Sequence, residues 1–289
     1  MSKPKILVQL DSDKHASVFD AVVAVDSGID QILQYRQVAV KDVEGLVHGA
    51  MFTRGPADLH QTAVFVGGAD VAGGEALMEA ATNCFFGPMR VSVMMDSNGS
   101  NTTAAAAVLA AARHVKLAGA QALVLAGTGP VGMRAARLLA GQGASVKLAS
   151  RSLERAQQAA ASVSQQVPES DVVGVATGSE EETALAASGV DVIIAAGAAG
   201  IQLISKQTWQ ICEQLKVLID LNAVPPLGIE GVDVMDQQRT EGDVILYGAI
   251  GVGGTKMKIH KAAVARLFES NDQVLDADEI YAIGESLEA

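Results

Sequence analysis

The sequence predicts an α/β protein with two domains, each built on a mostly parallel sheet. Short apolar runs rich in Val, Ile and Leu alternate with helical patterns through nearly the whole chain. This alternation is typical of βα units, in which each helix returns the chain to the next parallel strand. The length of 289 residues suits two domains of ordinary size. We expect them to be joined by the alanine-rich helix near residues 102–112, which leads directly into the next strand.

The first expected domain, residues 1–101, begins with a βα pattern. Its strands are expected at Lys5–Leu10, Gln31–Tyr35, Ala63–Val66 and Arg90–Met95. Ser17 is a candidate N-cap for a helix that runs to Asp26, and a second helical pattern covers Val40–Ala50. Gly67 and Gly68 then precede another helix. Because they lack the full glycine pattern of a phosphate loop, a close-packed βα turn is favoured over a second phosphate site.

The second expected domain, residues 102–254, contains the strand that starts at Gln121 and later β-like runs. These later runs are expected at Asp171–Val175, Val190–Ala195, Val217–Leu221 and Val244–Tyr247. A glycine-rich turn at Gly248–Gly254 is expected to precede a helix from Thr255 to about Glu269. Residues 255–289 are mostly helical by pattern, so we expect them to pack back on the first domain. The cleft between the domains would then hold the active site.

A glycine motif marks the start of the second domain. An apolar run ends in Gly127-x-Gly129-x-x-Gly132, and a helical pattern and a second β-like run follow. Gly127 would permit a tight strand-to-helix turn, Gly129 would let a pyrophosphate approach the backbone, and Gly132 would allow close helix packing. The helix N-terminus offers free N–H groups to the phosphates. The motif predicts a Rossmann-type dinucleotide site, against the alternative of an ordinary glycine-rich turn. Its residues are Gly127, Thr128, Gly129, Pro130, Val131 and Gly132.

The end of the second strand indicates which dinucleotide is bound. An NAD site usually places Asp or Glu there, but this strand ends in Ser150, Arg151 and Ser152. A guanidinium fork suits a 2′-phosphate, and the flanking hydroxyls can donate to it. NADP is therefore preferred, with NAD as a weaker or additional cofactor. The ratio stays open, because Ser152 stands where a second basic residue would strengthen the site and because Arg151 could be an ordinary surface arginine.

Composition narrows the function classes. The net charge of −12 and pI near 4.8 argue against nucleic acid or anionic membrane as a partner. Cys84 and Cys212 are too few for a disulfide framework, which indicates free thiols in a reducing cytoplasm. The N-terminus has no signal-peptide pattern, and the alanine run Ala104–Ala112 is too short to span a bilayer. The histidines lack metal-ligand spacing, so we expect a metal-free mechanism in a cytoplasmic protein.

Lys256 and His260 are four residues apart and would face the same way from the last helix. Lys256 falls in the expected first turn, where the helix dipole disfavours a cation. A residue that breaks a local rule in this way is a candidate functional residue. The alternative is an exposed surface lysine followed by a structural histidine.

Polar residues also gather after the last strand of the first domain. The cluster comprises Asn98, Ser100, Asn101, Thr102 and Thr103. These side chains could hydrogen-bond a polar heterocycle, although at least some of them must serve as turn and capping residues. Phe19 and Asp20 follow the first strand, where a substrate contact and core packing are both reasonable for an aromatic residue.

Eight segments together resemble one enzyme family over nearly the entire chain. They are SVFD (17–20), FTRG (52–55), VFVGG (64–68), FFGP (85–88), DSNGSNTTAAA (96–106), AGTGPVGMRAARLLAGQGA (126–144), NAVPPLGI (222–229) and GAIGVGGTKMKIH (248–260). The family is the bacterial NADP-dependent methylene-tetrahydromethanopterin dehydrogenases of methylotrophs, the MtdA type, which are related to methylene-tetrahydrofolate dehydrogenases. DSNGSNTT and NAVPPLGI are far more specific than the glycine motif.

The resemblance implies an oxidoreductase of one-carbon metabolism and methylotrophy. It implies hydride transfer from methylene-tetrahydromethanopterin, and from methylene-tetrahydrofolate, to NADP, in a cytoplasmic homo-oligomer that is a trimer in the family. It places Phe19, Thr103, Lys256 and His260 at the substrate. We also expect Asp20, Asn98, Asn101 and Thr102 to contact substrate, and Gly127–Gly132 with Arg151 to hold NADP.

The implied reaction abstracts no proton, so it needs no general base. Asp20 could offset the charge that develops. Lys256 is expected either to be neutral, through the helix dipole and burial, or to be held against a carbonyl group that lies away from the reacting carbon. Two rivals are an NADP-dependent dehydrogenase of a hydroxy acid, with Lys256 as proton acceptor, and a non-catalytic NADP sensor. A coupled cyclohydrolase activity is disfavoured, because the lysine motif of the bifunctional folate enzymes is absent. The sequence leaves open the preferred pterin and the direction of flux.

Overall fold

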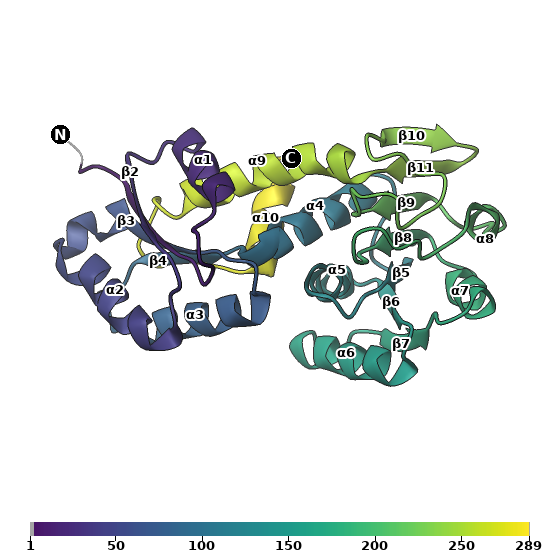
Figure 1. Cartoon of the computed structure of the whole chain (residues 1–289), viewed down its shortest axis with the longest axis horizontal. Coiled ribbons are helices and arrows are strands. Elements are labelled where there is room, and N and C mark those ends of the chain that lie inside the picture. The colour runs from purple at the N-terminus through teal and green to yellow at the C-terminus, as the bar shows by residue number, and fades with distance from the viewer. Residues whose placement is uncertain (1–2, 289) are drawn as a thin grey trace. The chain divides into compact units, whose positions relative to one another are not determined.

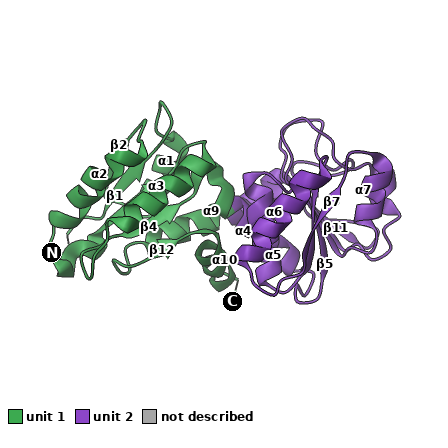
Figure 2. Cartoon of the chain, turned by 90° about the horizontal axis from the view of Figure 1, so that it is seen from below, with its two compact units in different colours: residues 1–102, 257–289 green, residues 103–256 purple. Residues whose placement is uncertain are grey.

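The computed structural model describes residues 3–288 and alternates helices with strands (Figure 1). The chain divides into two compact units, residues 1–102 with 257–289 and residues 103–256 (Figure 2). We call these unit 1 and unit 2. Both boundaries lie within helices, namely α4 (Ser100–Ala112) and α9 (Ala249–Arg266). The predicted α/β class with two mainly parallel sheets is confirmed.

Unit 1 contains a five-stranded parallel sheet with the order β12-β4-β3-β1-β2. Its strands are β1 (Ile6–Leu10), β2 (Gln31–Tyr35), β3 (Thr62–Val66), β4 (Ser92–Met95) and β12 (Val274–Leu275). Its helices are α1 (Val18–Asp26), α2 (Val40–Phe52), α3 (Val71–Asn83) and α10 (Ala277–Ser286), with 3-10 turns η1 (Pro56–Gln61) and η2 (Ser97–Gly99). As predicted, Ser17 caps α1, because its hydroxyl accepts from the Asp20 N–H.

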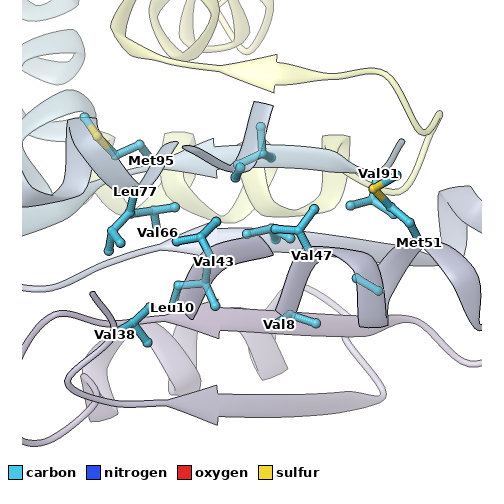
Figure 3. Packing of buried hydrophobic residues seen from close by; sticks show 14 of the residues in the cluster. Val8, Leu10, Val38, Val43, Val47, Met51, Val66, Leu77, Val91 and Met95 are labelled. Atoms are coloured by element: carbon cyan, nitrogen blue, oxygen red, sulfur yellow. The ribbon is translucent and has the colours of Figure 1, made fainter. Parts of the chain in front are cut away.

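One face of this sheet is covered by α2 and α3. Figure 3 shows Val43 and Val47 of α2 beside Val8 and Leu10 of β1. These side chains are buried and form one apolar cluster with residues of α3 and the neighbouring strands. Since all the strands are parallel, their carboxyl ends meet at one edge of the sheet. The residues that follow β1, β3 and β4 are therefore neighbours in space.

Unit 2 contains a seven-stranded sheet with the order β10-β11-β9-β8-β5-β6-β7, in which only β10 is antiparallel. Its strands are β5 (Gln121–Leu125), β6 (Ser145–Ser150), β7 (Val172–Ala176), β8 (Val192–Ala195), β9 (Val217–Asp220), β10 (Gln237–Glu241) and β11 (Val244–Tyr247). Its other helices are α5 (Pro130–Gly141), α6 (Leu153–Gln166), α7 (Glu180–Ala187) and α8 (Lys206–Gln210). The strand order reverses between β5 and β8, which is where ligands bind in doubly wound sheets.

The glycine-rich segment after β11 is helical, so the predicted turn at Gly248–Gly254 is wrong. α9 begins at Ala249, and Lys256 is therefore well inside the helix. A Cβ on Gly251 would overlap the carbonyl oxygen of Asp236, and a Cβ on Gly248 would overlap that of Asp233. These glycines allow the start of the helix to pack against another backbone segment. The nearby edge strand β10, whose sequence is polar, was not predicted.

Within residues 3–288, none of the helices combines the length and apolar character needed to cross a bilayer. Cys84 and Cys212 are both free thiols, as predicted. Burial raises the pKa of each thiol, so both are weakly nucleophilic at neutral pH.

Candidate functional site

The glycine motif forms the junction between β5 and α5. Gly129 is the N-cap of α5, and Pro130 and Val131 begin the helix. The left-handed residue of the turn is Ala126, with φ of 51°, whereas Gly127 has negative φ. A Cβ on Gly127 would lie 2.9 Å from the Val124 oxygen of the preceding strand, so the tight turn requires a glycine there, as predicted. It would also lie 2.8 Å from Leu148 Cγ, so Gly127 allows close packing against β6 as well.

The other two glycines differ in what surrounds them. A Cβ on Gly132 would lie 2.7 Å from the Gly127 Cα, so the predicted close packing at this position is confirmed. A Cβ on Gly129 would have its nearest neighbours at 3.8 and 4.0 Å, the oxygens of Ala126 and Ala196. The space in front of the α5 N-terminus is therefore open, as an approaching phosphate requires.

A cavity of about 870 Å³ lies along the carboxyl ends of β5, β6, β7 and β8. Its lining includes Thr128, Gly129, Ser150, Arg151, Ser152, Arg155 and residues 196–198 and 201–205. The volume suits a large ligand, and the donors suit an anionic one. An adenine dinucleotide therefore fits the residues present: the open Gly129 N-terminus suits its pyrophosphate, and the guanidinium groups suit a 2′-phosphate.

Arg155 was missed in the sequence, although the signal was present. Ser152 caps α6, and its hydroxyl accepts from the Arg155 N–H at 3.4 Å. Capping makes Arg155 the third helical residue, and its side chain lines the same cavity as that of Arg151. A second basic residue thus lines the cavity three positions after Ser152, in the first turn of α6.

Asp96 is the centre of a polar cluster at the carboxyl edge of the unit 1 sheet. It follows β4 and is 2% exposed. Its carboxylate accepts from the N–H groups of Asn101 and Thr102, both at 3.0 Å, and from the Thr102 hydroxyl at 2.7 Å. These bonds fix the first turn of α4 against the sheet. Thr102 is consequently turned towards Asp96.

His260 lies against this carboxylate and two aromatic rings. Its Nδ1 is 3.8 Å from Asp96 Oδ2, and the side chain is 1% exposed. The Phe65 ring stacks on the imidazole with centroids 5.8 Å apart and an interplanar angle of 15°. Phe19, which is half exposed, approaches the same imidazole at 6.2 Å. The cluster thus combines a buried carboxylate beside an imidazole with an aromatic surface.

Asp20 and Asp11 complete the cluster. Burial is the largest influence on Asp20 and raises its pKa, His260 opposes this shift, and the charges of Asp96 and Asp11 add to it. Asp11 is fully buried and accepts from the N–H groups of Asp13 and Ser17. Asp11 was not predicted, because as a lone aspartate after a strand it carries no motif.

Gly67 lies between these carboxylates. A Cβ on Gly67 would lie 3.2 Å from Asp20 Oδ2 and 3.5 Å from Asp11 Oδ2. A Cβ on Gly68, where φ is +94°, would lie 2.5 Å from the Ser12 hydroxyl. The predicted close-packed turn at this glycine pair is confirmed.

The remaining predicted substrate residues differ in burial and in their hydrogen-bond partners. Asn101 is buried, and its amide donates to the Met95 oxygen and to Asp276 Oδ1. Asn98 has φ of 53° and an exposed side chain, and its N–H donates to the Gly68 oxygen. Thr103 is half buried in the first turn of α4. Lys256 is half buried and lies one turn before His260. It is not in the first turn of α9, so the prediction that the helix dipole disfavours a cation there is wrong.

Comparison with known proteins gives a consistent result. Residues 18–98 match the family model for the N-terminal part of methylene-tetrahydromethanopterin dehydrogenase, and residues 114–229 match a putative NAD(P)-binding model. The bifunctional protein MdtA of Methylorubrum extorquens AM1 is 46% identical, covering 99% of this chain and 100% of that protein. The NAD(P)-dependent methylenetetrahydromethanopterin dehydrogenase of the same organism is 30% identical, covering 96% and 97%.

A solved structure shows the same fold at low identity. Quinate dehydrogenase from Corynebacterium glutamicum, in complex with NAD, is 15% identical with a TM-score of 0.51, covering 98% of this chain and 100% of that one. The likeness extends over both units. The two full-length relatives and the family models show that the chain belongs to the methylenetetrahydromethanopterin dehydrogenase family and is an oxidoreductase with an NAD(P)-binding domain.

Proposed function

We propose that this protein oxidises methylene-tetrahydromethanopterin, and methylene-tetrahydrofolate, to the methenyl form by hydride transfer to NADP. The observation that carries the proposal is the cluster of Asp20, Asp96 and His260 with its aromatic rings. Most of this cluster falls within the segment that matches the family's N-terminal model. We assign residues 1–101 and 255–289 to the pterin and residues 102–254 to NADP.

The proposed chemistry needs positioning and charge stabilisation. The substrate carbon lies between two nitrogens, and loss of hydride leaves a cation that both nitrogens share. NADP, when bound, supplies the nicotinamide carbon that accepts the hydride. Because no proton is removed, no side chain acts as a base. Phe19 and His260 are assigned to the substrate surface, and the Asp20 carboxylate offsets the positive charge that develops.

Asp96 acts as a positioning residue in this proposal. It holds the Thr102 hydroxyl and lies beside His260, so it fixes two groups assigned to the substrate site. Thr103 follows Thr102 directly in the same helical turn, and Asn98 and Asn101 shape that turn through their backbone and amide contacts. Burial of Asp96, Asn101 and Thr102 keeps their geometry fixed during turnover.

Lys256 is assigned to bind rather than to react. Its position inside α9 removes the dipole as a reason for a neutral amine. Of the two roles expected from the sequence, binding a pterin carbonyl that lies away from the reacting carbon therefore fits better. A charged ammonium at that distance does not oppose the developing cation as strongly as one beside it.

The preference for NADP over NAD rests on two guanidinium groups. Arg151 and Arg155 line one cavity with Ser150 and Ser152, and β6 ends without a carboxylate. A 2′-phosphate could accept charge-assisted hydrogen bonds from both arginines, each worth about 1.5–3 kcal/mol. NAD lacks that phosphate and gains nothing from them.

Turnover by the purified protein tests this proposal. Methylene-tetrahydromethanopterin and methylene-tetrahydrofolate are each assayed with NADP⁺ and NAD⁺. Activity with NADP⁺ and either pterin supports the proposal, and binding of NADP⁺ without turnover of any pair overturns it in favour of a sensor. A hydroxy acid that reduces NADP⁺ would favour the alternative dehydrogenase. Homo-oligomeric state and cytoplasmic location stay predictions.

A further inference from the structure

A second cavity lies in unit 1, at the carboxyl end of β2. Its volume is about 440 Å³, and its lining includes Tyr35, Arg36, Lys41, Asp42 and Gly45. The strand before it is paired with β1, and the Asp11 N–H donates to the Tyr35 oxygen at 3.0 Å. The cavity therefore lies at the same edge of the sheet as the polar cluster, next to the strand that carries Asp11.

The cationic side chains around this cavity differ in sign from the net charge of the whole chain, which is negative. The net charge is −12, yet Arg36 and Lys41 both line this space with exposed side chains. The one carboxylate in the lining is Asp42, whose Oδ2 accepts from the N–H of Ala39, the N-cap residue of α2, at 3.0 Å. The N–H group at the start of α2 thus partly neutralises the Asp42 carboxylate, so the two cations determine the sign of the charge in the cavity.

The backbone around the cavity leaves room for a ligand. Gln37 has φ of 53°, and its N–H donates to the Asp13 oxygen at 2.9 Å, so the turn after β2 is fixed to the loop after β1. Gly45 follows Lys41 by one helical turn, and a Cβ there would meet nothing within 4 Å. The surface of α2 beside Lys41 is therefore accessible.

We propose that this cavity binds the anionic tail of the pterin substrate, through Arg36 and Lys41. This inference rests on the proposed function. Both pterins carry an aromatic arm that ends in an acidic tail, with carboxylates in tetrahydrofolate and with a phosphodiester and carboxylates in tetrahydromethanopterin. In the sheet order, β4 and β2 are separated by β3 and β1, a span of roughly 14 Å at the usual strand spacing. A ring held near Asp96 would thus direct its arm along the sheet edge towards Arg36.

The test is a double variant, R36Q with K41Q, compared with a control that removes the same charge elsewhere. The control is K3Q with K116Q, since both lysines are exposed and neither lines this cavity. KM and kcat are measured for methylene-tetrahydromethanopterin and for methylene-tetrahydrofolate with one and with three glutamates, at low and high salt. Thermal melting establishes that both variants fold.

The expected result is a KM about fivefold higher for the pterins in the cavity variant, with kcat and the KM for NADP unchanged, since exposed ion pairs are individually weak. The salt dependence of KM should also become smaller. A larger effect with tetrahydromethanopterin identifies the phosphodiester as the bound group, and a larger effect with triglutamate identifies carboxylates. Equal pterin KM values in the two double variants overturn the inference while the proposed function stands. A wild-type protein that turns over neither pterin overturns both.

Discussion

Gly132→Ala tests whether the glycine motif is held by backbone packing. The new Cβ would lie 2.7, 2.9 and 3.0 Å from the Cα, oxygen and carbonyl carbon of Gly127. Carbon atoms in contact normally lie about 3.5–4.0 Å apart, so α5 must move by roughly 0.5–1 Å. No side chain can relieve this contact, because all three atoms belong to the backbone. Overpacking of this kind costs about 1–3 kcal/mol of the free energy of unfolding.

Two other glycines serve as matched controls. At Gly129 an added Cβ has its nearest neighbours at 3.8 and 4.0 Å, so Gly129→Ala should change the free energy of unfolding by no more than about 0.5 kcal/mol. The methyl group would nevertheless enter the space assigned to the phosphates. At Gly49, inside α2, nothing lies within 4 Å, and Gly49→Ala should stabilise the protein by about 0.5–1 kcal/mol.

The assay is urea denaturation without cofactor, followed by calorimetric titration with NADP⁺. We expect Gly49→Ala to be the most stable variant and Gly132→Ala to be the least stable. The wild type and Gly129→Ala should lie between them with nearly equal free energies of unfolding. The Kd for NADP⁺ should rise at least about tenfold in Gly129→Ala, which corresponds to about 1.4 kcal/mol. A Gly132→Ala variant as stable as the wild type, or a Gly129→Ala variant that binds NADP⁺ normally, would refute this reasoning.

Three further variants test the polar cluster and its surroundings. Asp20→Asn should lower kcat yet raise the free energy of unfolding near pH 7 by about 0.5–2 kcal/mol. Because burial raises the pKa of Asp20, the wild type loses stability as the pH rises from the ordinary value of 3.8 through the raised one. Denaturation at several pH values should show the gain growing with pH, and a constant gain would contradict the assignment. Phe19→Ala should raise the pterin KM by about tenfold with the Kd for NADP⁺ unchanged, and loss of NADP⁺ binding would place Phe19 elsewhere. Lys256→Met should raise the pterin KM by at least about tenfold, whereas normal kcat and KM would exclude any role for it.

Local signals in the sequence predicted the βα order and the position of the glycine motif well. Strand and helix periodicity act over a few residues, and the close packing at Gly132 follows from the motif itself. The same signals failed at Ala126, because a left-handed alanine is rare and no propensity favours it. They failed again at the start of α9. There the close approach of Gly251 to Asp236 outweighs the poor helix propensity of glycine.

The candidate sites show the same limit. Asn98–Thr103 formed a visible polar cluster, yet the sequence could not distinguish Thr102, which bonds Asp96, from Asn98, whose side chain is exposed. That distinction depends on which strand ends lie together at one sheet edge. Asp11 reaches Gly67 only through the pairing of β1 with β3, and Phe65 reaches His260 only because the end of α9 returns to unit 1. Non-local pairing of this kind cannot be read from one segment of the chain.

The polar cluster also explains why a protein would retain several buried charges. Burying Asp96 beside His260 costs desolvation energy that a well-packed apolar core would not. The raised pKa of Asp20 means that its ionised form is disfavoured in the folded protein. A substrate that becomes a cation during the reaction stabilises the ionised Asp20 carboxylate most strongly once the positive charge has developed. The interaction is therefore stronger in the transition state than in the bound substrate, so it lowers the barrier and does not only tighten binding. The Asp20 carboxylate thus destabilises the folded protein but favours formation of the methenyl cation. When Asp20 is neutralised, the free energy of unfolding should therefore rise while kcat falls.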